Sequence, residues 1–496
     1  MSAVADRPRS GAPLVELSGP LPASRYANHD IAPTPIAERT WSMWNVAALW
    51  VGLSVCIPTY MLAAALIQAG MSWWQAMAAI FIGNAIVLVP LIVNGHAGTR
   101  YGIPFPVYAR ASFGMSGAHI PAIARSVVAC GWFGIQTWVG GLAISEIVGI
   151  LWPGWQQIGG GATVLGQTAP AFLGFFIFWL INVYFVWAGT ESIKWLETVS
   201  APFLIAVGLA LLWWATHRVG GLGTVLARSD ALVGTRTPAH GFLLGLFLPW
   251  VTAMVGYWAT LSLNIPDLMR FARSQRAQAL GQTIGLMTTM PLFAFIGIAV
   301  TGATVILYGH AIWNPVELIG RLAAERHNPV LGILALVTIL VATLTTNIAA
   351  NVVGPANSIA NLSPRRIGYR AGGMVAVVIG VLIMPWKLLD AYQGWLISYS
   401  GLMGAIGGVV VCDYLFLRRG QLDLAGLYRE GGRYTYRGGF NPAALVAMGA
   451  GIAVALAGLV VPALRFLFDG AWFSAAVVSG VLYCVLMNSD RARGDA

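Results

Sequence analysis

Charged residues are scarce in this chain. Of its 496 residues only 9% are Asp, Glu, Lys or Arg, whereas 58% are hydrophobic, and the mean hydropathy is +0.74. A soluble protein of this length needs a far more polar surface, so the composition excludes a soluble globular fold. We therefore expect a polytopic membrane protein whose surroundings are a lipid bilayer.

The residues that usually carry enzyme chemistry are also few and scattered. The four cysteines lie far apart in or beside apolar segments, without metal-ligand spacing, and are predicted to be free thiols: Cys56, Cys130, Cys412 and Cys484. Neither an HExxH nor a Gly-x-Ser-x-Gly motif is present. We expect neither an enzyme nor a bound cofactor.

Long apolar runs are abundant instead, and each is long enough to cross a hydrocarbon core of about 30 Å as a helix. The predicted fold class is all-α, with twelve transmembrane helices. Their predicted ranges are 44–69, 73–94, 117–150, 169–188, 195–216, 241–263, 280–308, 329–353, 371–387, 391–412, 442–463 and 470–488.

The distribution of basic residues predicts the orientation. Under the twelve-helix prediction, 20 of the 28 Lys and Arg residues fall in the two tails and the loops on one side. Basic loops stay in the cytoplasm, so both termini are expected there. The first forty residues lack an apolar segment behind a basic start, so no cleavable signal peptide is expected. The net charge of +10 is explained by these loops and requires no nucleic acid.

An indole and a primary amide lie one helical turn apart in the third predicted span. Trp132 and Gln136 therefore share a face of that helix. An amide buried at membrane depth costs several kcal/mol without a partner, and a flat polar ligand on the indole would satisfy it. The pattern indicates a binding site for a planar heterocycle. The alternative is that Gln136 joins two helices and Trp132 only packs.

Two predicted spans contain helix-breaking residues. The first carries Gly52 and Pro58, and the sixth carries Pro249 and Gly256. A break at membrane depth frees backbone carbonyls, which must then face protein, water or a ligand. The two weak helices are five spans apart, as expected of a five-plus-five inverted-repeat transporter with substrate at the midplane. A simple proline kink in each span is the alternative.

The eighth predicted span adds a third polar cluster, in which four of seven residues are Thr or Asn. Its hydroxyls belong to Thr345 and Thr346, and its amides to Asn347 and Asn351. Hydroxyl oxygens are hard donors suited to a small cation, although Thr can also bond back to its own helix and Asn can join helices. Arg125, inside the third span, is expected to reach the cytoplasmic headgroups or to line the inward path.

Several segments together resemble the nucleobase:cation symporter-1 family, and bacterial allantoin permeases in particular. The resemblance covers about residues 28–437, and its motifs are Asn28–Pro33, Arg39–Asn45, Gly95–Pro106, Ala129–Trp138, Asn264–Asp267 and Thr345–Asn351. It implies a LeuT-like five-plus-five fold with broken helices 1 and 6. It also implies a bacterial inner-membrane location.

The resemblance also implies which residues bind substrate. In a hydantoin-transporting relative the ring stacks between two tryptophans while a glutamine and an asparagine bond its amides. The candidate substrate residues in this chain are Trp132, Gln136, Trp258, Asn351, Cys56 and Asn264. Cys56 replaces a glutamine of that relative, and Asn264 replaces a serine. These two changes argue against simply copying the hydantoin specificity.

A sodium site is implied in the same way, by helix 1 and helix 8 carbonyls together with two hydroxyls. The matching residues are Gly52, Val55, Ala342, Thr345 and Thr346. Some family members use protons, so the coupling ion is expected to be Na⁺ or H⁺.

We therefore predict cation-coupled import of a small planar cyclic ureide or nucleobase, with allantoin ranked first. Uracil, cytosine, purine or hydantoin transport is the alternative within the family. A channel or a sensor that does not transport is the alternative outside this class. The predicted organisation is a tail (1–43), repeat 1 with helices 1–5 (44–216), repeat 2 with helices 6–10 (241–412), helices 11–12 (442–488) and a tail (489–496).

Overall fold

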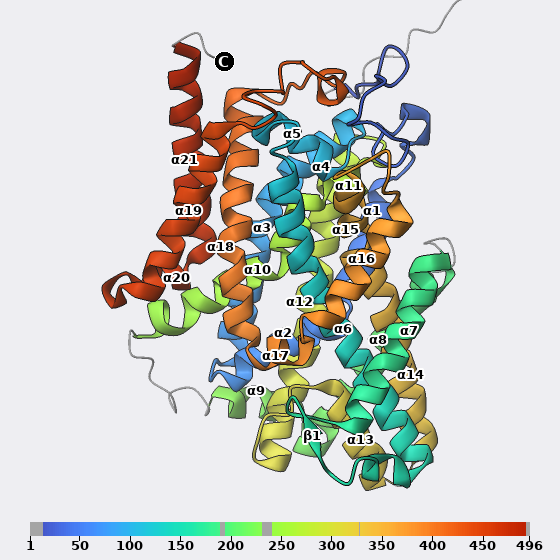
Figure 1. Cartoon of the computed structure of the whole chain (residues 1–496). Helices are drawn as coiled ribbons and strands as arrows, with labels where there is room; N and C mark the ends of the chain where they lie inside the picture. The colour runs from blue at the N-terminus through green and yellow to red at the C-terminus, as the bar shows by residue number, and fades with distance from the viewer. Residues whose placement is uncertain (1–12, 189–193, 231–240, 327, 493–496) are drawn as a thin grey trace, which may run out of the picture.

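The computed structural model describes residues 13–188, 194–230, 241–326 and 328–492, and helices dominate it (Figure 1). The first half contains η1 (Ile36–Glu38), α1 (Met43–Ser54), α2 (Ile57–Gln68), α3 (Trp73–Tyr101), α4 (Phe105–Tyr108), α5 (Arg110–Phe113), α6 (His119–Leu151), η2 (Pro153–Gln157), α7 (Ala169–Ala188), α8 (Lys194–Val219) and α9 (Leu222–Asp230). A short antiparallel hairpin, β1 (Thr163–Val164) with β2 (Gln167–Thr168), lies between α6 and α7.

The second half begins with a π-helical turn and continues almost entirely as helix. It contains η4 (Leu243–Phe247), α10 (Leu248–Asn264), α11 (Pro266–Met269), α12 (Gln275–Tyr308), α13 (Pro315–Arg326), α14 (Pro329–Asn351), α15 (Val353–Ala360), α16 (Tyr369–Leu382), α17 (Pro385–Asp390), α18 (Tyr392–Cys412), η5 (Asp413–Leu417), η6 (Gly426–Tyr428), α19 (Pro442–Val460), η7 (Pro462–Leu464), α20 (Arg465–Asp469) and α21 (Ala471–Ala492).

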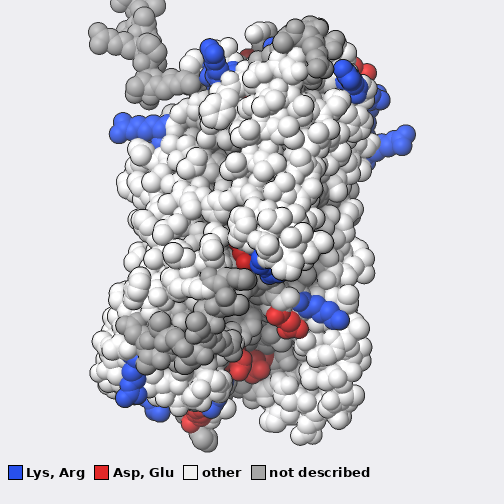
Figure 2. Space-filling view, turned by 90° about the vertical axis from the view of Figure 1, so that its left-hand side faces the viewer, with Lys and Arg blue, Asp and Glu red and all other residues white. Residues whose placement is uncertain are grey.

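The helices agree with a membrane-spanning fold. Within the described residues, ten single helices are long and apolar enough to cross a membrane, and the bent pair α1–α2 makes an eleventh span. At the predicted ninth position lies α16, a shorter apolar helix of 14 residues. Figure 2 shows a band without charged side chains below the end where most basic side chains stand, with acidic side chains gathered lower on this face.

The predicted break in helix 1 is confirmed. Helices α1 and α2 meet at 58°, separated by Val55 and Cys56 in non-helical conformations. Pro58 does not itself interrupt a helix, because it lies in the first turn of α2, where a missing N–H breaks no intrahelical bond.

Helix 6 differs from the prediction, because it is continuous from Leu243 to Asn264. Its irregularity is the π-helical turn η4, which directly precedes the first turn of α10, where Pro249 lies. Gly256 allows close packing rather than a break. A Cβ there would lie 2.7 Å from the carbonyl oxygen of Leu396 on α18.

Helix packing follows the symmetry of a five-plus-five repeat. Helix α1 packs on α12, and its expected counterpart α10 packs on α3. Helices α6 and α14, which are equivalent in the two halves, pack on each other. The last helices, α19 and α21, pack on α18 at the periphery of the molecule (Figure 1).

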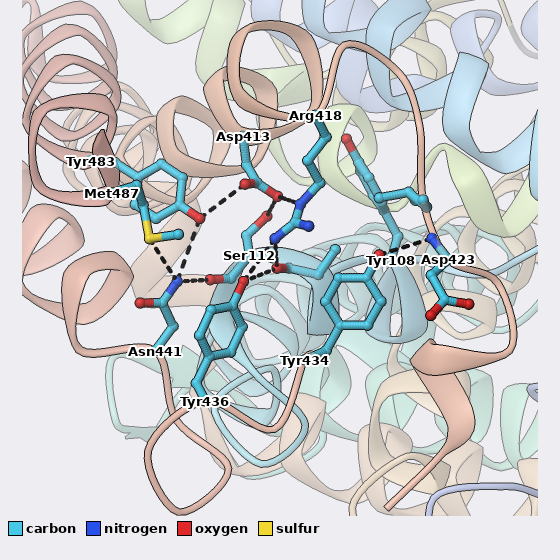
Figure 3. Close-up of polar contacts among 12 residues, drawn as sticks. Tyr108, Ser112, Asp413, Arg418, Asp423, Tyr434, Tyr436, Asn441, Tyr483 and Met487 are labelled. Atoms are coloured by element: carbon cyan, nitrogen blue, oxygen red, sulfur yellow. Dashed lines mark hydrogen bonds and ion pairs between the residues drawn. The ribbon is translucent and has the colours of Figure 1, made fainter. Parts of the chain in front are cut away.

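A buried polar cluster holds one end of α18 in place (Figure 3). Arg418 pairs with Asp413 in η5 at 2.6 Å, and Ser112 of α5 donates to the same carboxylate. Tyr483 of α21 donates to its other oxygen, while Asn441 donates to the Ser112 carbonyl. A buried carboxylate requires such partners, and here they join four elements at one end of the bundle.

Close helix packing predicts a stability difference between two glycines. A Cβ at Gly141 of α6 would lie 2.6 Å from the backbone nitrogen of Phe175 on α7, whereas one at Gly449 of α19 meets nothing within 4 Å. Gly141→Ala is therefore expected to cost about 1–3 kcal/mol and to lower the Tm of the purified protein. Gly449→Ala is the matched control and should leave Tm equal or higher. Equal Tm values for the two variants would contradict rigid packing of α6 on α7.

Candidate functional site

A central cavity lies beside the break in helix 1. It is lined by α1, α6, α10 and α14 together with the break itself. The lining residues are Leu53, Cys56, Trp132, Gln136, Tyr257, Trp258, Thr260, Leu261, Thr346, Ala350 and Asn351. Five of the six predicted substrate residues thus meet in one cavity, although they come from four different parts of the chain.

The two predicted tryptophans present rings to this cavity. Both are 5% exposed, and each indole N–H has a partner elsewhere. Trp132 donates to the Tyr399 hydroxyl at 3.1 Å, and Trp258 contacts the Met290 sulfur at 2.9 Å. Because the polar edges are occupied, what the two indoles offer a ligand is their aromatic surface.

The amides contribute hydrogen-bonding groups. Gln136 is 4% exposed, and its side-chain carbonyl oxygen has no hydrogen-bond partner among the described residues. A buried acceptor without a partner costs about 1–3 kcal/mol, which an N–H of a ligand would recover. Asn351 donates to Asn347 at 3.0 Å, and this bond holds its amide at the cavity wall.

Asn347, one turn before Asn351, does not line the cavity. Its amide donates towards the Phe133 carbonyl, Thr137 and Asn182 on α6 and α7. Asn347 therefore joins three helices, while Asn351 reaches the cavity.

Asn264 lies outside the cavity. It is the last residue of α10 and is 2% exposed. Asp267, three residues later, accepts from the backbone N–H of Phe105, the first residue of α4, at 3.0 Å. Burial raises the pKa of Asp267 to about 6, although Arg125 and Arg270 attract the charged form.

Arg125 does not reach the headgroups. It is 1% exposed, and its guanidinium lies over Gly354 of α15, where a Cβ would clash with it. Glycine at that position gives the guanidinium room inside the protein.

Sequence reasoning missed Tyr257 as a lining residue. Its hydroxyl lies 3.3 Å from the Cys56 sulfur and 3.0 Å from the Thr59 hydroxyl, so it ties α10 to the break. The weak hydrogen-bonding group of Cys56 is thus already engaged by its own protein. The only sequence signal for Tyr257 was its position directly before Trp258. Adjacent residues of a helix point in different directions, so helical periodicity does not predict that both line the same cavity.

The predicted sodium ligands are partly assembled. Thr346 donates to the Gly52 carbonyl at 3.3 Å, which places a hydroxyl of α14 against the last turn of α1. Thr345 donates back to the Ala342 carbonyl at 3.1 Å. Val55 lies at the break and is buried. Carbonyl and hydroxyl oxygens suit a hard cation, so this donor set fits Na⁺.

The cavity has a volume of about 40 Å³. At roughly 10–15 Å³ for each water it holds about three waters, so a ring enters only if the lining side chains separate. The structure therefore shows the central cavity in a contracted form.

These features are those of a multi-pass membrane transporter, with a central cavity beside a broken helix. The family model described as "Permease for cytosine/purines, uracil, thiamine, allantoin" matches residues 33–475. The chain belongs to this family.

Individual relatives and solved structures agree. The purine-uracil permease NCS1 of Arabidopsis thaliana is 41% identical over 93% of this chain and 78% of its own length. The allantoin permease of Bacillus subtilis (strain 168) is 38% identical over 94% of each chain. Mhp1 in an inward-facing conformation matches with a TM-score of 0.77 at 28% identity, covering 95% of this chain and 96% of that chain. A closed Mhp1 with bromovinylhydantoin bound has a TM-score of 0.75 at 28% identity, over 93% of this chain and 95% of that chain.

Gln136→Ala is expected to abolish tight ligand binding in the central cavity, because it removes the unpartnered side-chain carbonyl but little packing. Asn264→Ala is the matched control, since Asn264 is equally buried but lies outside the cavity. Binding of radiolabelled allantoin and uracil to the purified variants, with Tm as the test of folding, measures the difference. Unchanged affinity in a folded Gln136→Ala protein would refute the site.

Proposed function

We propose that this protein is a secondary transporter that imports a small planar cyclic ureide or nucleobase by cation-coupled alternating access, with allantoin as its first substrate. The observation that carries the proposal is the central cavity, where two tryptophans, the free carbonyl of Gln136 and the amide of Asn351 meet at the break in helix 1. Aromatic surfaces select flat rings, and amides pair with the N–H and C=O groups of a ureide or lactam.

Two substrate classes remain within this proposal. The 38% identity to an allantoin permease over 94% of both chains supports the ureide. The 41% identity to a purine-uracil permease supports a nucleobase as the second candidate. Both kinds of ring are flat and carry lactam-like groups, so the same cavity chemistry serves either.

Thr346 supports coupling of the ligand to a cation. It lines the central cavity and also contacts the Gly52 carbonyl, so one side chain borders both candidate sites. A cation held by Gly52, Val55, Ala342, Thr345 and Thr346 would draw α1 and α14 together. That would complete the wall against which the ring binds.

Transport then follows from relative motion of two helical bundles. The proposed repeats, 44–216 and 241–412, place the cavity between them, and rocking of one bundle against the other opens it to each side in turn. We place both termini in the cytoplasm of a bacterium, with the protein in the inner membrane. No chemical step on the substrate is needed.

The experiment that tests the proposal is uptake of radiolabelled allantoin by cells expressing the chain. Unlabelled hydantoin, uracil, cytosine and adenine compete, with Na⁺ present or replaced. Saturable, concentrative uptake blocked best by allantoin is expected, and concentrative uptake excludes a channel. Uptake blocked best by uracil or adenine would move the assignment to the nucleobase class. Absence of uptake of every ring would refute transport and favour a sensor.

Thr346→Ala is expected to weaken cation-dependent uptake by about tenfold or more, because it removes one oxygen ligand. Thr346→Ser retains the hydroxyl and is the matched control. The measurement is the dependence of initial uptake rate on Na⁺ concentration and on pH. An unaltered cation response in Thr346→Ala would contradict the role of this hydroxyl.

A further inference from the structure

A second, larger cavity lies near the end of α2 that is farther from the helix 1 break. Its walls are the last turn of α2, parts of α10, α17 and α18, and the segment between α12 and α13. Its volume is about 250 Å³. That is space on the order of twenty waters, enough for a small heterocycle, whereas the central cavity holds about three. We call it the outer cavity.

The chemistry of the outer cavity repeats that of the central one. Its aromatic side chains are Trp250, Trp313 and Tyr392, and its polar side chains are Gln68, Gln393 and Asp390. Indole and phenol rings offer flat surfaces, while two amides supply both donors and acceptors. This combination suits a ring that carries amide groups.

Asp390 restricts the charge of that ring. The carboxylate is exposed and lines the cavity. It accepts N–H donors and repels carboxylate-bearing molecules. The outer cavity therefore favours a neutral cyclic amide over an acidic one.

Tyr392 contacts the walls of both cavities. It lines the outer cavity, and its hydroxyl donates to the Pro58 carbonyl at 3.4 Å in the first turn of α2. Its ring also meets Trp132, a wall of the central cavity, edge to face with centroids 6.0 Å apart. One side chain thus lies against both the outer cavity and the tryptophan on which the ring is proposed to stack.

We propose that the outer cavity is a separate, weaker binding site for the same neutral ring, occupied before the ring reaches the central cavity. Breaking the single long hydrogen bond from Tyr392 to Pro58 and rotating the phenol joins the two cavities. This inference rests on the proposed function, because it takes the ligand to be a cyclic ureide or nucleobase. Trp313 and Gln393 bind at the outer site only.

The test is the number of rings bound by the purified full-length protein, with radiolabelled allantoin and uracil as probes. Wild type is expected to bind two equivalents of the preferred ring, one tightly and one weakly. Gln136→Ala should retain only the weak equivalent, and Trp313→Ala only the tight one. Trp472→Ala, a likewise half-buried tryptophan on α21 that lines neither cavity, is the control and should retain both.

A single equivalent in wild type that is lost entirely in Gln136→Ala overturns the outer site and leaves the proposed function standing. Failure of wild type to bind either probe overturns both the outer site and the proposed function.

Uptake kinetics provide an independent test of the outer site. Trp313→Ala and Gln393→Ala are expected to raise the half-saturation concentration about tenfold with little change in maximal rate, since only capture is weakened. Unchanged half-saturation in both variants would also overturn the proposal.

Discussion

Hydrogen bonding of the backbone at membrane depth is the constraint on which this architecture depends. Hydrocarbon supplies no partner for a free carbonyl, so a helix can break only where side chains replace the lost bonds. At the break in helix 1 one side chain bonds a carbonyl that the break leaves free, and a second adds a bond to the first turn of α2. Thr346 on α14 bonds Gly52 before the break, and Tyr392 on α18 bonds Pro58 after it. Both bonds that stabilise the break also border the proposed sites.

The break therefore couples three regions through short polar contacts. On one side Thr346 joins the candidate cation ligands to the central cavity, and on the other Tyr392 lines the outer cavity and contacts Trp132 of the central one. Tyr257 adds a third tie, from α10 to Cys56. All three contacts fall within residues 52–58, two on backbone carbonyls and one on the Cys56 side chain. Such linkage is what alternating access requires.

The site could be predicted where its signals were local. Trp132 and Gln136 lie one turn apart on an unbroken helix, so their shared face followed from helical geometry alone. The break in helix 1 could be located near Pro58 for a similar reason, within a few residues. The continuity of helix 6 could not be predicted from local sequence. Its proline and glycine resemble breaking residues, yet a π-helical turn and close packing on α18 keep the helix continuous.

The sequence by itself determined the class of protein and the approximate positions of its membrane-spanning helices, because hydropathy and helical spacing are properties of neighbouring residues. Only the tertiary structure decided which polar groups meet. In the folded protein Asn347 lies at a junction of three helices, whereas Asn351, one turn away, lines the cavity. It leaves Asn264 outside and buries Arg125 over Gly354. These outcomes depend on which helices pack together, and spacing along one helix does not contain that information.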